Sequence, residues 1–168
     1  MKRMALLLLT GCASMVQAPA SPTARFPKAW SDVRKSSLLA VLDFRNKLKG
    51  EDVDASYFSN AVRVAVKRTA PSVRVMTREN VIVLLQSQGK TLEDCEGECE
   101  IDTGRRLGAD YVVSGEILRI GSSYKLDLRL HETRDGQLVG GVAVSGHTVD
   151  ELDANTGPVV IELLSSLR

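Results

Sequence analysis

Only a few side chains in this sequence suit catalysis or metal binding, because it contains three cysteines and two histidines. Cys95 and Cys99 lie in one acidic segment with Gly97 between them. Such a pair can close a small disulfide ring, remain as free thiols or bind a metal. A structural zinc site needs four nitrogen or sulfur ligands, and only His131 and His147 could complete one. The acidic residues lack the alternating spacing of a calcium loop. The sequence therefore predicts no metal and no cofactor.

A hydrolytic site would need a nucleophile with a base beside it. His131 and His147 are the only histidines, and Asp135 or Asp150 could orient them. However, the sequence has no Gly-x-Ser-x-Gly elbow, no phosphate-binding loop and no His-Glu-x-x-His. We therefore predict that the protein is not an enzyme.

Charged residues near the ends of predicted elements are candidates for contact with a partner. Arg105 and Arg106 form a basic pair that suits either an anion site or, more typically, a solvated helix face. Arg78 and Glu79 begin a predicted helix, and residues 43–45 (Asp-Phe-Arg) follow an apolar run. Since these segments end neighbouring elements, their shared edge is a predicted protein interface.

The amino terminus has the pattern of an export signal. Lys2 and Arg3 precede an apolar run over residues 4–9, and a small-residue site follows. That run is far shorter than the roughly 20 apolar residues that span a bilayer. Its end, Leu9-Thr10-Gly11-Cys12, resembles the lipobox of bacterial lipoproteins. The alternative is an ordinary signal peptide in which Cys12 is incidental.

The lipobox resemblance implies a signal peptide over residues 1–11 and a lipid anchor on the thiol of Cys12. In such proteins an aspartate after the cysteine marks retention in the inner membrane, and this sequence has Ala13 there. The resemblance therefore implies that the protein is anchored at the periplasmic face of the outer membrane. Two or three acyl chains suffice for stable anchoring. Export to an oxidising compartment also favours a disulfide between Cys95 and Cys99 over thiols or a metal.

Composition and patterning divide the rest of the chain. A net charge of +1 gives no support for nucleic-acid binding, and 4% aromatic residues leave little for stacking on bases or sugars. Residues 12–37 are rich in Ala, Pro and Ser and have no apolar period, which is typical of a tether. Residues 38–168 form the predicted domain.

Apolar periodicity within the domain predicts alternating strands and helices. The final helix is expected to break or kink near Gly157 and Pro158. In the second helix Val81, Leu84 and Leu85 are expected to face inward. The fold class is α/β (α+β), with a single mixed β-sheet packed with helices. The predicted strands are 38–44, 73–76, 109–118, 124–130 and 138–144, joined by a charged loop at 45–52 and a hairpin turn at 133–136; the predicted helices begin at 54, 78, 101 and 149 and end by Pro71, Gly89, Gly108 and Leu167.

Three segments of the domain resemble the TolB N-terminal and CsgG-like domains. Residues 40–44 (Ala-Val-Leu-Asp-Phe) are similar to the first strand, and 76–80 (Met-Thr-Arg-Glu-Asn) to the following strand-to-helix corner. Residues 104–117 match a helix, a Gly-Ala-Asp turn and the central strand. Gly108 is expected to leave the helix with positive φ, and Gly115 to mark a bulge or a close backbone approach.

The family resemblance implies a cell-envelope protein that binds other proteins. We predict an adaptor or activator of an envelope machine, similar to the lipoprotein activators of peptidoglycan synthases. The alternative is a subunit of a homo-oligomeric CsgG-like ring or secretion assembly. A pore is disfavoured because the candidate spanning loops, 45–53 and 87–101, are short or charged. The expected partners are the membrane, through the lipid on Cys12, and an envelope protein or a second copy.

Overall fold

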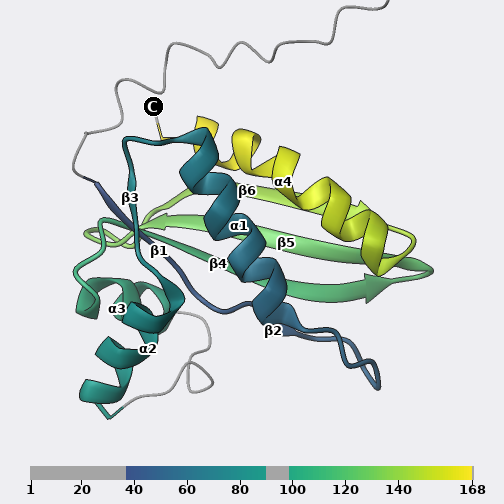
Figure 1. Cartoon of the computed structure of the whole chain (residues 1–168), viewed down its shortest axis with the longest axis horizontal. Coiled ribbons are helices and arrows are strands. Elements are labelled where there is room, and N and C mark those ends of the chain that lie inside the picture. The colour runs from purple at the N-terminus through teal and green to yellow at the C-terminus, as the bar shows by residue number, and fades with distance from the viewer. Residues whose placement is uncertain (1–36, 90–98, 168) are drawn as a thin grey trace, which may run out of the picture.

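The computed structural model describes residues 37–89 and 99–167. The described residues form one mixed β-sheet with helices on both faces (Figure 1). In chain order the elements are β1 (Leu38–Val41), β2 (Arg45–Asn46), α1 (Ala55–Thr69), β3 (Arg74–Val75), α2 (Arg78–Ser87), α3 (Cys99–Arg106), β4 (Tyr111–Ile120), β5 (Ser123–Glu132), β6 (Leu138–Gly146) and α4 (Val149–Ser165).

The strand order is β3-β1-β4-β5-β6, with β2 paired to β4 beside β1. β1 pairs in parallel with β3 and β4, whereas β4, β5 and β6 are antiparallel neighbours. Helices α1 and α4 cover one face of the sheet, and α2 and α3 lie at the β1–β3 end of the other (Figure 1). The predicted single mixed sheet packed with helices is confirmed.

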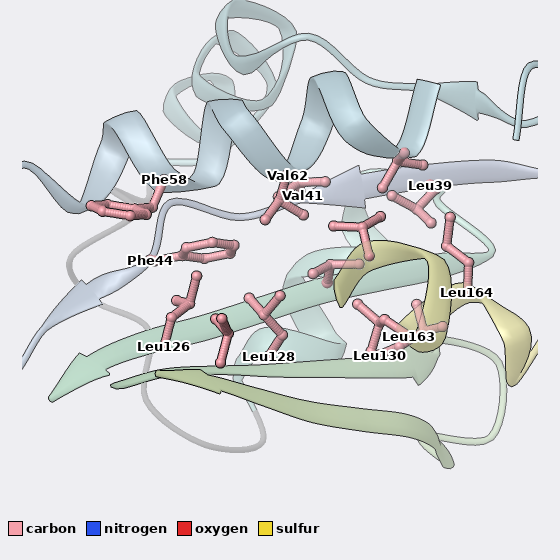
Figure 2. Packing of buried hydrophobic residues seen from close by; sticks show 14 of the residues in the cluster. Leu39, Val41, Phe44, Phe58, Val62, Leu126, Leu128, Leu130, Leu163 and Leu164 are labelled. Carbon is pink, nitrogen blue, oxygen red and sulfur yellow. The ribbon is translucent and has the colours of Figure 1, made fainter. Parts of the chain in front are cut away.

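The larger hydrophobic core lies between the sheet and helices α1 and α4 (Figure 2). The alternation of Leu126, Leu128 and Leu130 puts three fully buried side chains of β5 on this face. From α1, Phe58 and Val62 recur at helical spacing and are buried against them. Each such side chain contributes about 1.5–3 kcal/mol by leaving water, so this layer dominates the stability of the domain.

A smaller core on the opposite face joins Ala40 and Leu42 to α2. Val81 and Leu85 of α2, spaced i and i+4, are buried there. Leu84 was predicted to face inward, but its side chain is exposed. The prediction is wrong because the short helix rests on the end of the sheet only through the Val81–Leu85 stripe.

The first strand is interrupted where a continuous strand over 38–44 was predicted. β1 ends at Val41, and pairing with β4 resumes only at β2, inside the predicted charged loop. Three residues, 42–44, thus lie opposite two residues of β4, which is a bulge. Phe44 packs over Gly115, where an added Cβ would lie 3.1 Å from the Phe44 ring and 2.9 Å from a backbone oxygen of β5. Gly115 therefore permits a close approach, as one of the two predicted alternatives stated.

The remaining boundaries differ from the predictions by a few residues. α3 begins at Cys99 rather than residue 101, and β4 spans 111–120 rather than 109–118. α4 runs unbroken through Pro158. The predicted break does not occur because apolar residues before and after the proline, such as Leu152 and Leu163, pack into the same core. Gly108 has φ of 66°, as predicted. In the described part of the chain no helix is long and apolar enough to cross a membrane.

Candidate functional site

A groove of about 820 Å³ lies between α1 and the corner where β3 leads into α2. Figure 1 shows these elements side by side at one edge of the sheet. The amino termini of both helices open onto it. Its lining combines charged, polar and apolar side chains: Asp54, Ser56, Tyr57, Asn60, Arg63, Val64, Lys67, Arg74, Val75, Met76, Thr77, Arg78 and Glu79.

Local sequence signals place the two helix termini at this groove. Asp54 caps α1, since its carboxylate accepts hydrogen bonds from the backbone N–H groups of Ser56 (2.9 Å) and Tyr57 (3.4 Å). The Ser56 hydroxyl also donates to this carboxylate and, as the largest cause, lowers the pKa of Asp54. Thr77 caps α2 in the same way through the N–H of Asn80 (3.3 Å). Both helices therefore start at defined positions.

An ion pair joins the end of β1 to the start of α2. Arg78 Nε lies 2.8 Å from Asp43 Oδ2, and the Arg78 terminal nitrogen Nη2 lies 2.6 Å from the same oxygen. β1 and β3 are parallel, and Asp43 follows β1 while Arg78 follows β3. The carboxyl ends of the two strands therefore bring Asp43 and Arg78 to the same edge of the sheet. The Ser59 hydroxyl donates to Asp43 Oδ1 at 3.3 Å. Hydrogen bonding to Asp43 raises the pKa of Arg78, so the pair remains charged.

Arg63 of α1 closes the same edge from below the groove. Leu39 and Val41 direct their carbonyls toward β3, and Met76 N–H donates to Leu39. Because β3 has ended, Arg63 Nη2 donates to the Val41 carbonyl instead, at 2.6 Å. Arg63 is only 7% exposed. Burial lowers its pKa, and the nearby Asp43 carboxylate opposes that shift. Within the described residues its Nε and Nη1 have no hydrogen-bond partner.

The outer wall of the groove offers exposed apolar surface beside charge. Tyr57 is 52% exposed and Val64 42% exposed. Arg78 and Glu79 stand at the opposite wall. Hydrogen bonds from its own backbone N–H and from Thr77 lower the pKa of Glu79. The groove therefore combines apolar side chains with groups of both charges.

The structure brings together part of the predicted interface. Asp43, Arg78 and Glu79 meet at or beside the groove. Phe44, in contrast, is buried in the core, and Arg45 turns to the other face, where its guanidinium lies 3.3 Å from Glu100.

The structure does not bring Arg105 and Arg106 to the groove. Arg105 donates to the Thr133 carbonyl at 2.6 Å and so secures the β5–β6 turn. Arg106 forms an exposed ion pair with Asp102 one helical turn away. Their contact with a partner stays a prediction, as does that of Arg78 and Glu79.

The other reactive residues lie apart from the groove. Within the described residues neither His131 nor His147 forms a hydrogen bond with Asp135 or Asp150, and His131 Nδ1 is buried there without a partner. In the same residues no group of three or more His, Cys, Asp or Glu could hold a metal. Cys12 and Cys95 lie outside the described residues, so the lipid site and the Cys95–Cys99 pairing stay predictions.

Sequence reasoning missed Arg63, Tyr57 and Val64. Arg63 follows the buried Val62 directly, and a cation beside the apolar stripe of a helix is usually solvated. The available signal was Asp43, a carboxylate at the end of a buried strand, which needs a cation within reach.

The comparisons with known proteins agree with this architecture. No family model and no curated protein matches the chain. Among solved structures, the chain is similar to the LpoB C-terminal domain from Salmonella enterica, with a TM-score of 0.56 and 18% identity over 67% of this chain and 83% of that one. For the lipoprotein GNA1162 from Neisseria meningitidis the TM-score is 0.55 and the identity is 16%, over 66% of this chain and 79% of that one. For TolB from Acinetobacter baumannii the TM-score is 0.51 and the identity is 13%, over 79% of this chain and 28% of that one. The predicted resemblance to TolB is thus confirmed for the fold.

Proposed function

We propose that this chain is an outer-membrane lipoprotein whose periplasmic domain binds another envelope protein, as an adaptor or activator. The finer proposal is activation of a peptidoglycan synthase. The signal and lipobox over residues 1–12 support export and anchoring. The similarity of fold to LpoB and to the lipoprotein GNA1162 supports a comparable role.

The observation that carries the protein-binding proposal is the groove. Tyr57 and Val64 expose apolar surface there, and charged residues from the starts of α1 and α2 line the same groove. An apolar centre with a polar rim is the usual anatomy of a protein interface. The groove is also built on a rigid base, because the Asp43–Arg78 pair and Arg63 fix its floor.

A photo-crosslinking experiment in cells tests this proposal. A photoreactive amino acid replaces Val64 in the full-length chain, and Val83, which is 61% exposed on α2 outside the groove, serves as the matched control. We expect crosslinks from position 64 to a peptidoglycan synthase, identified by mass spectrometry, and none from position 83. If neither position gives an envelope protein, or both give the same set, the groove is not the binding site.

The activator role is tested with the purified synthase found in that experiment. Added chain from Ala13 onward should raise the rate of glycan polymerisation several-fold. Val64→Asp places a carboxylate on the apolar wall of the groove and should weaken this effect about tenfold, a difference of about 1.4 kcal/mol. Val83→Asp should not change it. An unchanged rate with wild-type chain would leave a binding adaptor but no activator.

The anchor has a separate test. Cys12→Ala should abolish labelling of the protein with radioactive palmitate and release it from the outer-membrane fraction. Cys12→Ala protein that still labels and still fractionates with the outer membrane would overturn the lipid-anchor proposal.

A further inference from the structure

Strand β6 forms the edge of the sheet opposite to β3. It is nine residues long and contains neither a charged residue nor a proline. Sheet edges in soluble proteins are ordinarily protected by lysines, prolines, short strands or covering segments. The β3 edge follows that rule, since β3 is two residues long, begins with Arg74 and lies just after Pro71. β6 does not follow it.

The hydrogen-bonding pattern of the sheet shows which N–H and C=O groups of β6 point away from β5. The carbonyls of Val113 and Ile117 accept from N–H groups of the β1–β2 segment, at 2.9 Å and 2.8 Å, so they point away from β5. Alternation through the regular antiparallel pairs of β4, β5 and β6 then points the backbone groups of Gly141, Ala143 and Ser145 outward.

A side-chain contact agrees with this direction. The Asn155 side-chain amide of α4 donates to the Ser145 carbonyl at 3.0 Å, from outside the ladder. Across residues 37–89 and 99–167, the N–H groups of Gly141, Ala143 and Ser145 have no hydrogen-bond partner. All three residues are exposed. The edge thus presents three free donors at every second residue, the spacing that an added strand requires.

The helix beside this edge is acidic. α4 carries Asp150, Glu151, Asp153 and Glu162 and no basic residue. Asn155 shows which side of α4 borders β6, and helical spacing places Glu151 and Glu162 on that same side. Both are exposed. An added strand would therefore have two carboxylates on its α4-facing side, those of Glu162 and of Glu151, which also accepts the His147 N–H at 2.8 Å.

We propose that the β6 edge binds an extended segment of a partner protein by strand addition, and that this segment carries Lys or Arg on the side facing α4. The inference rests on the proposed protein-binding function and adds a second contact surface to it. A second copy of this chain fits less well. Antiparallel pairing of β6 with itself would bring two α4 helices together, with Glu151 and Glu162 of each copy repelling those of the other.

The test uses the chain from Ala13 onward and two synthetic peptides of about nine residues, one alternating Lys with Val and one alternating Glu with Val. Amide hydrogen exchange is followed by NMR. We expect the Lys peptide to slow exchange at Gly141, Ala143 and Ser145 about tenfold or more, and the Glu peptide to have no effect. Ala143→Pro removes an outward N–H and spares the β5 ladder, so it should weaken binding about tenfold, whereas Ala143→Ser should not.

A second variant tests the proposal even if Ala143→Pro does not fold. Glu162→Lys changes an exposed side chain only and should weaken the Lys peptide several-fold. Equal effects of both peptides, or no protection by the Lys peptide, would overturn strand addition. Protection of the three amides in a dimer without peptide would replace the partner segment by a second copy.

The outcome separates this inference from the proposed function. A chain that crosslinks to an envelope protein at position 64 but leaves the β6 amides unprotected retains the adaptor role and loses strand addition. A chain that binds the Lys peptide but crosslinks to no envelope protein shows the reverse.

Discussion

The two edges of the sheet face the same physical problem and treat it differently. A strand at an edge exposes backbone donors and acceptors that no further strand satisfies. At the β3 edge, Arg63 donates to the Val41 carbonyl, and the Asp43–Arg78 pair covers the corner above it. At the β6 edge, the N–H groups of Gly141, Ala143 and Ser145 have no partner among the described residues. The comparison indicates that the first edge supports a preformed groove, while the second is left able to pair.

The largest effect should come from opening the closed edge. Arg63→Ala removes the donor to a buried carbonyl and leaves a space beside α1, so we expect the free energy of unfolding to fall by about 3 kcal/mol. Urea denaturation measures this. Arg63→Met is the matched control, because it fills much of the space and also removes two buried nitrogens that lack partners. Its loss should be clearly smaller. Both variants lack the donor to Val41, so equal losses would assign the effect to the hydrogen bond and not to the space.

Two adjacent glycines sharpen the comparison at the open edge. A Cβ at Gly140 would lie 2.7 Å from Ser166 Oγ and 3.2 Å from the Leu163 carbonyl, so Gly140→Ala must push the end of α4 away from β6. We expect a loss of about 1–2 kcal/mol in thermal or urea unfolding. At Gly141 the nearest atom is 3.7 Å away, and Gly141→Ala should be neutral or stabilise by about 0.5 kcal/mol. A reversed order of the two variants would contradict the packing of α4 on this edge.

The ion pair above Arg63 should matter less, because Arg78 is partly exposed. Arg78→Ala leaves the Asp43 carboxylate without its cation, and solvent screening reduces the expected loss to about 1 kcal/mol. Arg78→Lys keeps the charge but not the paired geometry, so its free energy of unfolding should lie between those of wild type and Arg78→Ala. High salt should weaken the difference between wild type and Arg78→Ala in denaturation experiments. A difference that does not depend on salt would assign the loss to packing.

Periodicity in the sequence was sufficient to predict the layers of the fold. The strand predicted over 124–130 buries every second residue, Leu126, Leu128 and Leu130, and the helix predicted from residue 54 buries Phe58 and Val62 one turn apart. The boundary at Val41 was not predictable, because residues 38–44 are continuously apolar except for Asp43. The break depends on Phe44 packing over Gly115, a contact between segments far apart in the chain.

The candidate site was only partly visible in the sequence for the same reason. Arg78 and Glu79 could be chosen because helix starts follow strand ends at the carboxyl edge of parallel strands. Arg63 could not be chosen in this way, because it donates to the Val41 carbonyl, which has no backbone partner once β3 has ended. The partners of Arg105 were likewise hidden, since its hydrogen bond to the Thr133 carbonyl requires the β5–β6 turn to fold back onto α3.

The smallest effect concerns pH at the bulged end of the open edge. His131 pairs with Leu138, where the β5–β6 register shifts. Burial lowers the pKa of His131, Glu100 opposes the shift and Arg129 adds to it. Between this lowered pKa and the ordinary value of about 6.5, the unfolded chain binds a proton that the folded chain does not. Stability should therefore fall as the pH drops through about 6.5, and the fall should level off only below the pKa of the folded protein.

His131→Gln removes this contribution and should flatten the fall in urea midpoint between about pH 7.5 and pH 5.5. His147→Gln, at the exposed other end of β6, is the matched control and keeps the buried imidazole, so it should retain the wild-type slope. If both variants keep that slope, the buried ring does not resist protonation.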